Sequence, residues 1–216
     1  MGLLDVYYYV NDEIADWRTN NWFLVSSPLP ITFLTFAYLY FVLKCGPRYM
    51  EGRPAYKLYR FIRLYNIFQI VSNAMIIYAT IEAGWYKDYF IYCVKVDFTD
   101  SPQAMKFASI SWYLLLLKII DYIETGMFVL RKKQRQVSFL HLYHHVSTAW
   151  LAWAHIKYFT SGISLILPIV NCAVHVLMYT YYLLSSIKSL EKTMYSVKHF
   201  ITITQMVSIE TEYEGV

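Results

Sequence analysis

The sequence has little charge, little glycine and little cysteine. Charged residues make up 16% of its 216 residues, whereas soluble domains carry about a quarter, so polar material is too scarce to cover a globular surface. The same low charge excludes intrinsic disorder, seven glycines exclude a collagen-like chain, and three cysteines exclude a disulfide scaffold. A net charge of +4 is too small and too dispersed for nucleic-acid binding.

Apolar and aromatic residues dominate instead. The apolar share is 57% and the aromatic share 19%, with 22 Tyr, 13 Phe and 6 Trp. Tyrosine and tryptophan are enriched at membrane–water interfaces. The composition therefore predicts an all-α polytopic membrane protein.

Five apolar segments are long enough to cross a bilayer as helices of about 20 residues. The predicted spans are Trp22–Leu43, Leu64–Trp85, Phe107–Leu130, Ser138–Phe159 and Ile163–Ile187. A sixth apolar run, Val197–Ile209, ends after 13 residues and is followed by three glutamates within five residues. We expect five full transmembrane helices and a partial sixth in a single membrane domain over residues 1–216.

Basic residues crowd alternate loops between these spans. They are Lys44, Arg48, Arg53, Lys57, Arg60 and Arg63 in the first loop and Arg131, Lys132, Lys133 and Arg135 in the third. Because basic loops stay cytosolic, the first, third and fifth loops are predicted to be cytosolic and the N-terminus lumenal. Cys93 is the one cysteine in a predicted lumenal loop, so no disulfide is expected.

The third span carries four polar residues on one helical face: Lys118, Asp121, Glu124 and Thr125. Ionisable groups inside a membrane are costly, which makes them functional candidates by default. The alternative is purely structural, an intramembrane salt bridge between Lys118 and Asp121.

The fourth span begins with three histidines in five residues. His141, His144 and His145 lie at positions i, i+3 and i+4, which share a face of a helix. Such a cluster fits either metal ligation or nucleophilic and general-base chemistry.

The fifth span carries a second polar stripe at helical spacing. Its members are Asn171, His175, Met178, Tyr179 and Tyr182. Asn171 and His175 are the stronger candidates, because hydrocarbon offers them no hydrogen-bonding partner. The tyrosines fit packing equally well.

These three polar stripes all fall in the cytosolic half of the predicted bilayer. They are therefore expected to line one chamber that opens towards the basic third loop. A basic mouth over a polar chamber suits an anionic, phosphate-bearing ligand from the cytosol.

Four segments together resemble one family. Lys118–Thr125 with Phe128–Lys133 is similar to the KxxExxDT…FVLRKK stretch of the very-long-chain fatty acid elongases, with the two acidic residues exchanged. His141–His145 resembles their HxxHH box, and Asn171–Tyr182 their NxxHxxMYxYY segment. Gly46–Met50 resembles the GPxxM of animal members. These proteins are membrane 3-oxoacyl-CoA synthases of the endoplasmic reticulum.

The resemblance implies an activity and an architecture. Acyl-CoA and malonyl-CoA would condense to 3-oxoacyl-CoA, CO2 and free CoA without a cofactor or metal, inside a barrel made from the second to the seventh span. The rest of the sixth span, the seventh span and a lysine-rich tail are expected to be missing, since Thr202–Gln205 matches the family's TxxQxxQ only in part. Expected partners are the bilayer, other elongases, and the reductase and dehydratase of the cycle.

The resemblance also implies residue roles. His144 is the expected nucleophile, forming an acyl-imidazole, and Asn171 an oxyanion or enolate donor. The remaining roles fall to His141, His145 and His175 as orienting or acid–base groups, to Lys118, Asp121, Glu124 and Thr125 as supporting groups, and to Arg131, Lys132, Lys133, Tyr179, Tyr182 and Gln205 as substrate-binding groups.

Three alternatives remain at this stage. A histidine acting only as a base would support a concerted route. A di-iron desaturase or hydroxylase would use the HxxHH box as metal ligands, although six histidines are fewer than such enzymes need. A truncated, catalytically inactive elongase-like chain would act as a binding or regulatory subunit.

Overall fold

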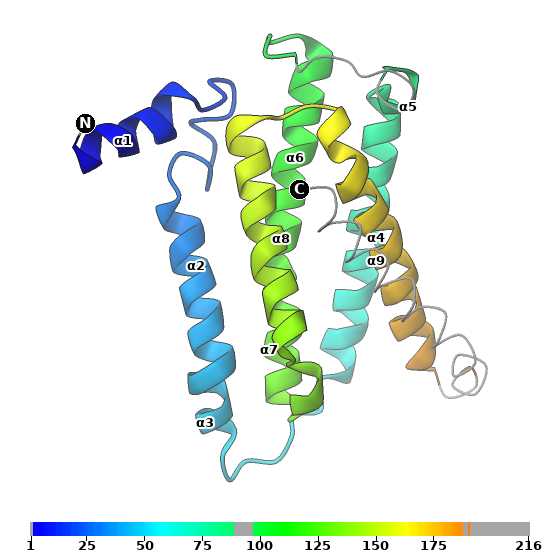
Figure 1. Ribbon diagram of the computed structural model, residues 1–216. Coiled ribbons are helices and arrows are strands. Elements are labelled where there is room, and N and C mark those ends of the chain that lie inside the picture. Colours follow the sequence, from blue (N-terminus) through cyan, green and yellow to red (C-terminus); the bar gives the residue numbers. More distant parts are fainter. Residues whose placement is uncertain (1, 89–96, 188–189, 191–216) are drawn as a thin grey trace. The chain divides into compact units, whose positions relative to one another are not determined.

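The computed structural model describes residues 2–88, 97–187 and 190, and within them the secondary structure is helical throughout (Figure 1). Contacts divide the chain into two units, Met1–Lys57 with Val94–Gly162 and Leu58–Cys93 with Ile163–Val216. The two units are described separately below. The single domain over residues 1–216 stays a prediction, and the predicted sixth run, Val197–Ile209, lies outside the described residues.

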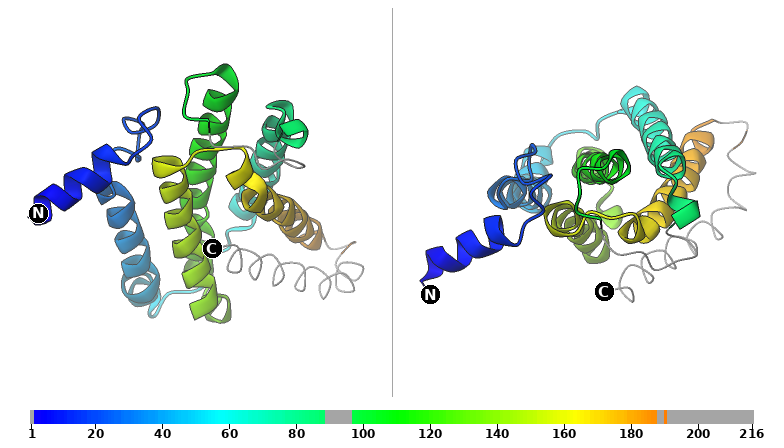
Figure 2. Two further views of the ribbon diagram at one scale, coloured as in Figure 1. Left: turned by 45° about the horizontal axis from the view of Figure 1, so that its top comes forward. Right: turned by 90° about the horizontal axis from the view of Figure 1, so that it is seen from above.

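The first unit contains three long helical segments, called rods below, over residues 29–50, 102–130 and 139–158. The elements of this unit are α1 (Leu3–Tyr8), the π-helix η1 (Tyr9–Glu13), α2 (Leu29–Tyr40), the π-helix η2 (Phe41–Cys45), α3 (Gly46–Met50), α6 (Pro102–Ile120), α7 (Tyr122–Leu130), the 3-10 helix η3 (Gln134–Gln136) and α8 (Phe139–Tyr158). Helix α8 packs along α6 (Figure 2). It also contacts α2, and α3 packs on α7.

The first rod begins at Leu29 rather than at the predicted Trp22. The reason is the pair Pro28 and Pro30, because proline is accommodated in the first turn of a helix but not in its interior. The rod then continues past the predicted end at Leu43, through η2 and α3 to Met50. The wider π-turn of η2 ends at Cys45, two residues before Pro47, which has no N–H for regular α-helical bonding.

The predicted third span, Phe107–Leu130, is divided into two helices by a turn at Asp121. The N–H of Glu124 donates to the carbonyl of Asp121 at 3.1 Å, an i−3 bond of the 3-10 type at this turn. Aspartate favours such interruptions because its side chain competes for backbone groups. At the other end, the hydroxyl of Ser101 accepts the N–H of Ala104 and caps α6.

Helix α8 matches the predicted fourth span, and both of its ends are capped. The Ser138 hydroxyl accepts the backbone N–H of His141 at 3.2 Å, so the three histidines begin in the first turn. At the far end, Thr19 donates its hydroxyl to the carbonyl of Ile156 at 2.6 Å, and the Asp16 N–H donates to Lys157 O at 2.8 Å. These bonds satisfy carbonyls that a helix C-terminus leaves open.

The second unit contains α4 (Tyr59–Glu82), α5 (Trp85–Asp88), the 3-10 helix η4 (Ile163–Leu165) and α9 (Ile166–Ser185). Helices α4 and α9 pack along each other. Arg63 of α4 donates to the carbonyl of Ser186, just after α9, at 3.2 Å. The predicted second and fifth spans are thus helices, with α4 starting five residues before the predicted Leu64.

Three helical segments of the described chain are long and apolar enough to cross a membrane: Leu29–Met50, Tyr59–Glu82 and Ile166–Ser185. The prediction of an all-α protein with several membrane helices is therefore confirmed. The other two predicted spans are also helical, as α6 with α7 and as α8. Helices α6, α7 and α8 contain the lysine, histidine and acidic side chains discussed above, which lower their mean hydropathy. The predicted total of five full transmembrane helices stays a prediction.

Candidate functional site

The three histidines at the start of α8 lie together, as their spacing predicted. The ring centres of His141 and His145 are 4.3 Å apart, and those of His144 and His145 are 5.7 Å apart. His145 is buried and the other two are half-buried. The start of the helix thus presents three imidazoles as close neighbours.

One of these imidazoles is held from the neighbouring helix α7. The Thr125 hydroxyl lies 2.9 Å from Nε2 of His141, and Thr125 is fully buried. The Phe128 ring lies 5.6 Å from the same imidazole. A ring fixed by a hydrogen bond on one nitrogen presents its other nitrogen in a defined direction.

Sequence reasoning missed a third member of this group, Tyr38 of α2. Its hydroxyl lies 3.0 Å from the Thr125 hydroxyl, and its ring stacks on Tyr122 with centres 4.0 Å apart and planes at 8°. A tyrosine in an apolar segment usually indicates packing, so the sequence carried no signal beyond its helical position.

The polar face predicted for the third span is present and buried. Its members Lys118, Asp121, Glu124 and Thr125 are all buried. The ammonium of Lys118 lies 3.7 Å from the carboxylate of Asp121. The structural alternative for these two residues, an ion pair inside the helical bundle, is therefore observed.

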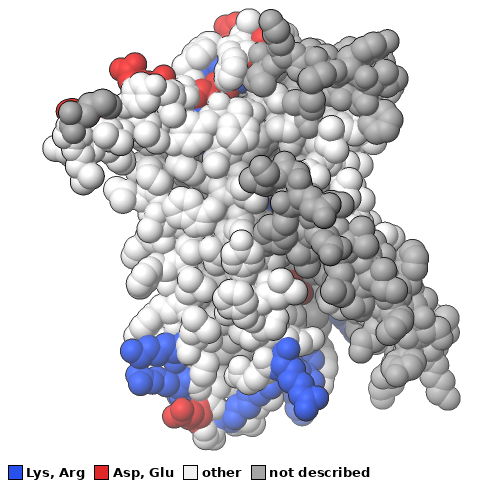
Figure 3. Space-filling view, viewed as in Figure 1, with Lys and Arg blue, Asp and Glu red and all other residues white. Residues whose placement is uncertain are grey.

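A basic surface forms one end of the first unit. Arg131 is half-buried, while Lys132, Lys133 and Arg135 are exposed, between α7 and α8. The N–H of Tyr56 donates to the carbonyl of Leu130 at 3.1 Å, which brings the predicted first loop, with its own lysines and arginines, against this connection. Lys and Arg accordingly predominate at this end of the unit, where exposed Glu51 also lies, and Asp and Glu are prominent at the end that bears α1 (Figure 3).

The candidate residues of the fifth span lie along one face of α9 in the second unit. Asn171, His175 and Tyr179 are buried, and Tyr182 is half-buried. The His175 ring meets Tyr179 edge-on at 5.6 Å, and Tyr179 meets Tyr182 at 6.2 Å. The chamber predicted to join His175 to the α8 histidines would need both units and stays a prediction, while Gln205 lies outside the described residues.

Helix α4 supplies a buried polar row that sequence reasoning also missed. Gln69 donates to the hydroxyl of Tyr65 at 2.7 Å, and Asn73 donates to the Gln69 side chain at 3.2 Å. The Tyr65 ring meets Tyr179 of α9 edge-on at 5.8 Å. Their spacing of four residues places these polar groups on one helical face, a signal that was available in the sequence.

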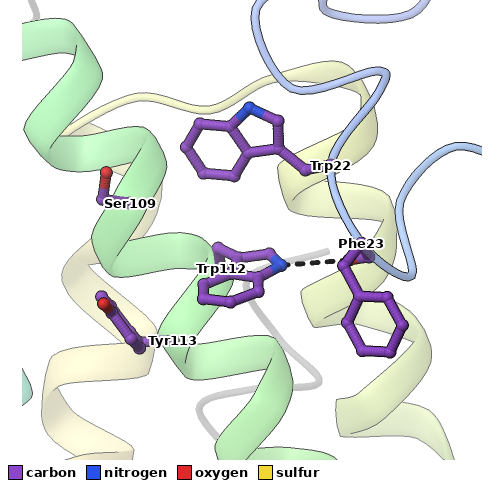
Figure 4. Close-up of a pocket in the computed structure, with 5 residues that line it drawn as sticks. All are labelled: Trp22, Phe23, Ser109, Trp112 and Tyr113. Atoms are coloured by element: carbon purple, nitrogen blue, oxygen red, sulfur yellow. Dashed lines mark hydrogen bonds between the residues drawn. The ribbon is translucent and has the colours of Figure 1, made fainter.

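A separate aromatic pocket of about 280 Å³ lies beside the middle of α6. It is lined by Trp22, Phe23, Ser109, Trp112 and Tyr113. The Trp112 indole donates to the carbonyl of Phe23 at 3.0 Å (Figure 4). The α8 histidines are not among the residues that line this pocket.

Two of the three cysteines and most of the potential metal ligands lie within the described ranges. Neither Cys45, which is exposed, nor Cys172, which is buried, forms a disulfide within those ranges, and Cys93 lies outside them. Three or more His, Cys, Asp or Glu side chains do not converge as metal ligands anywhere in the part of the chain that the structure describes.

A family profile matches this chain, and its curated relatives described below are named very long chain fatty acid elongases. Residues 23–211 match the sequence profile of the ELO family, described as the GNS1/SUR4 family. Very long chain fatty acid elongase 7 of Rattus norvegicus is 38% identical over 194 residues, which cover 89% of this chain and 69% of the relative. Very long chain fatty acid elongase 1 of Mus musculus is 35% identical over 193 residues, with the same coverage. Elongase 7 of Drosophila melanogaster is 32% identical over 91% of this chain and 60% of its own length.

Proposed function

Since this chain belongs to the GNS1/SUR4 family and its relatives are named fatty acid elongases, we propose that it performs the condensing step of fatty acid elongation. A long-chain acyl-CoA and malonyl-CoA give 3-oxoacyl-CoA, CO2 and free CoA. The observation that carries this proposal is the cluster of three adjacent imidazoles on α8, one of them fixed by Thr125.

The first half-reaction is acyl transfer to His144. A neutral imidazole nitrogen attacks the thioester carbonyl, the tetrahedral oxyanion collapses, and the CoA thiolate leaves and takes up a proton. The product is an acyl-imidazole, which is reactive enough to pass its acyl group on. Neighbouring His145, with its ring 5.7 Å from that of His144, accepts the ring N–H proton that His144 loses on acylation and passes it to the departing CoA thiolate.

The second half-reaction forms the new carbon–carbon bond. Loss of CO2 from malonyl-CoA leaves an enolate, which attacks the acyl carbon and displaces the His144 ring. The displaced ring takes up one proton from solvent, which restores neutral His144 and balances the carboxylate lost as CO2. Asn171 and His175 of α9 are proposed to donate hydrogen bonds to the developing negative charge. The buried polar residues Lys118 and Glu124 support the geometry from the third predicted span.

The basic surface between α7 and α8 is proposed to hold the CoA phosphates. Lys132 and Lys133 are exposed there, and Arg131 can make paired bonds to phosphate oxygens. The tyrosines Tyr179 and Tyr182, with Gln205, are proposed to contact the acyl substrate. This arrangement requires the basic end to face the cytosol, with the protein in the endoplasmic reticulum membrane and its N-terminus lumenal.

The proposal is tested by substitution of the nucleophile. Purified chain in liposomes is given acyl-CoA and radiolabelled malonyl-CoA, and 3-oxoacyl product is measured. We expect His144→Ala to reduce kcat below about one thousandth, as loss of a catalytic nucleophile does elsewhere. Tyr143→Phe is the matched control, because Tyr143 is exposed in the same turn, and it should retain full activity.

Two results would count against this assignment. Undiminished product from His144→Ala would exclude His144 as nucleophile. If the unsubstituted chain formed no product but still bound acyl-CoA, it would act as the binding or regulatory subunit instead. Elemental analysis of the same preparation tests the di-iron alternative, which requires about two irons per chain.

A further inference from the structure

Three side chains from three helices form a continuous row of hydrogen bonds. The Tyr38 hydroxyl of α2 lies 3.0 Å from the Thr125 hydroxyl of α7, which lies 2.9 Å from Nε2 of His141 on α8. Tyr38 and Thr125 are buried, at 7% and 0% exposure. Proton positions in such a row are therefore decided by the three groups themselves.

Each hydroxyl in the row has one proton to donate, and this fixes the direction of the bonds. Thr125 is the hydrogen-bond partner of the Tyr38 hydroxyl within the described residues. If Thr125 donated to Tyr38, the buried phenol O–H would have no acceptor, which is costly. The favoured direction therefore runs from Tyr38 to Thr125 and from Thr125 to Nε2 of His141.

We propose that Tyr38 is a positioning residue that fixes the tautomer of His141 through Thr125. Nε2 then accepts a hydrogen bond, so the proton of the neutral imidazole lies on Nδ1. His141 accordingly offers the reaction an N–H donor in place of a basic nitrogen. This catalytic consequence rests on the proposed condensing function, whereas the tautomer itself does not.

The surroundings of Tyr38 hold its hydroxyl in place. Its ring stacks on that of Tyr122 at 4.0 Å, and the Tyr122 hydroxyl is bonded to Thr35 at 3.3 Å instead of to Thr125. The two tyrosines are thus stacked neighbours of similar burial that serve different partners. Tyr122 provides a matched control for any substitution of Tyr38.

The first test reads the tautomer without any substrate. The chain is labelled with 15N-histidine in detergent micelles, and the His141 signals are assigned by their loss in His141→Asn. We expect an Nε2 signal of the pyridine type in the unsubstituted chain. In Tyr38→Phe the signal should move towards the average of the two tautomers, whereas Tyr122→Phe should leave it in place. An Nε2 signal of the pyrrole type, or one that ignores Tyr38→Phe, would overturn the proposal.

Thr125 supplies a second set of variants. Thr125→Val removes the link at nearly constant volume, so it should shift the His141 signal as Tyr38→Phe does. The double variant should show no further shift, because both changes break the same row. Thr125→Ser keeps the hydroxyl and should retain the original signal. Additive shifts in the double variant would contradict a shared route.

Steady-state kinetics then test the role of Tyr38 separately from the proposed condensing function. Tyr38→Phe should lower kcat about 2- to 10-fold, the range expected for losing one neutral hydrogen bond, with KM unchanged. A kcat unchanged in Tyr38→Phe although the tautomer shifts would overturn the catalytic role alone. If the unsubstituted chain is inactive, the condensing function fails, and the 15N signal still decides the tautomer.

Discussion

At the scale of single residues, the least expected feature is a buried ion pair near the start of the chain. The side chains of Asp16 and Arg18 are fully buried, with a guanidinium nitrogen 2.6 Å from a carboxylate oxygen. Arg18 also donates to the carbonyls of Asp97 at 2.7 Å and Thr160 at 3.2 Å. The Arg18 guanidinium therefore links the segments that contain Asp16, Asp97 and Thr160. It can do so because a guanidinium carries five N–H donors in one plane.

Removing that guanidinium should destabilise the first unit. Arg18→Met keeps most of the side-chain volume but leaves the Asp16 carboxylate buried without its counter-charge. We expect a loss of about 3–5 kcal/mol in the free energy of unfolding, measured by thermal unfolding in detergent.

The control for this prediction is Arg53→Met. The Arg53 guanidinium lies 4.0 Å over the ring of Tyr49, but both residues are exposed. An exposed cation–π contact contributes about 0.5–1 kcal/mol. Equal destabilisation by the two variants would contradict a special role for the buried pair.

At the scale of helices, one close approach controls how α3 meets α7. A Cβ added at Gly46 would lie 2.7 Å from Cγ1 of Val129 and 2.8 Å from the carbonyl oxygen of Phe41. Both distances are far below van der Waals contact, and Val129 is itself fully buried. The glycine of the GPxxM segment is therefore required by packing.

Gly46→Ala should accordingly be destabilising despite the better helix propensity of alanine. We expect a loss of about 1–3 kcal/mol from overpacking, seen as a lower midpoint of thermal unfolding. Gly126→Ala on α7 is the control, because its Cβ would meet only Phe41 at an ordinary 3.7 Å. That variant should be neutral or stabilised by up to about 1 kcal/mol; a Gly46→Ala variant as stable as this control would refute the packing account.

The polar row on α4 gives a second prediction for a helix. Gln69 is fully buried and bonded to both Tyr65 and Asn73. Gln69→Leu removes the hydrogen bonds that Gln69 makes with Tyr65 and Asn73. It should therefore lower the free energy of unfolding by about 1–3 kcal/mol. Met75→Leu, at an exposed site of the same helix, should be neutral. A stable Gln69→Leu would show that the row is dispensable for folding.

The sequence predicted the helices well because apolar length and periodicity are local properties. The bounds of helix α8 agree closely with the predicted span Ser138–Phe159. The ends of the first rod did not, since hydropathy alone gave no weight to Pro28 and Pro30. The break at Asp121 was missed for a related reason, as the aspartate was considered as a functional group and not as a helix interruption.

The candidate site was predictable only within single helices. The spacing of His141, His144 and His145 was sufficient to place three imidazoles together. The link from Tyr38 was not predictable, because it joins residues 87 positions apart whose contact depends on how α2 packs. Such contacts depend on tertiary packing. The periodicity of a sequence shows the face of a single helix but does not show which helix packs against it.

At the scale of the whole molecule, charge is separated along the first unit. Basic residues lie around α3 and the connection from α7 to α8, and acidic residues lie around α1 (Figure 3). Basic segments next to membrane helices are retained in the cytosol. The charge distribution thus agrees with the proposed orientation, in which CoA substrates arrive from the cytosol.

That orientation predicts which end of the protein is reachable in sealed microsomes. In a chain whose three cysteines are replaced by serine, Lys133→Cys should react with a membrane-impermeant maleimide added outside. Asp5→Cys should react only after detergent opens the vesicles. The reverse pattern would place the basic end in the lumen and remove the proposed route for CoA.

The covalent acyl-imidazole is the central claim, and mass spectrometry of the trapped enzyme tests it most directly. The chain is incubated with acyl-CoA alone, quenched and digested, and the peptide that contains residues 139–157 is fragmented. The account predicts one added acyl group on His144, which disappears when malonyl-CoA is supplied before quenching and is missing in His144→Ala. Product formation with an unmodified His144, or with the acyl group on Cys45 or Cys172 instead, would contradict it.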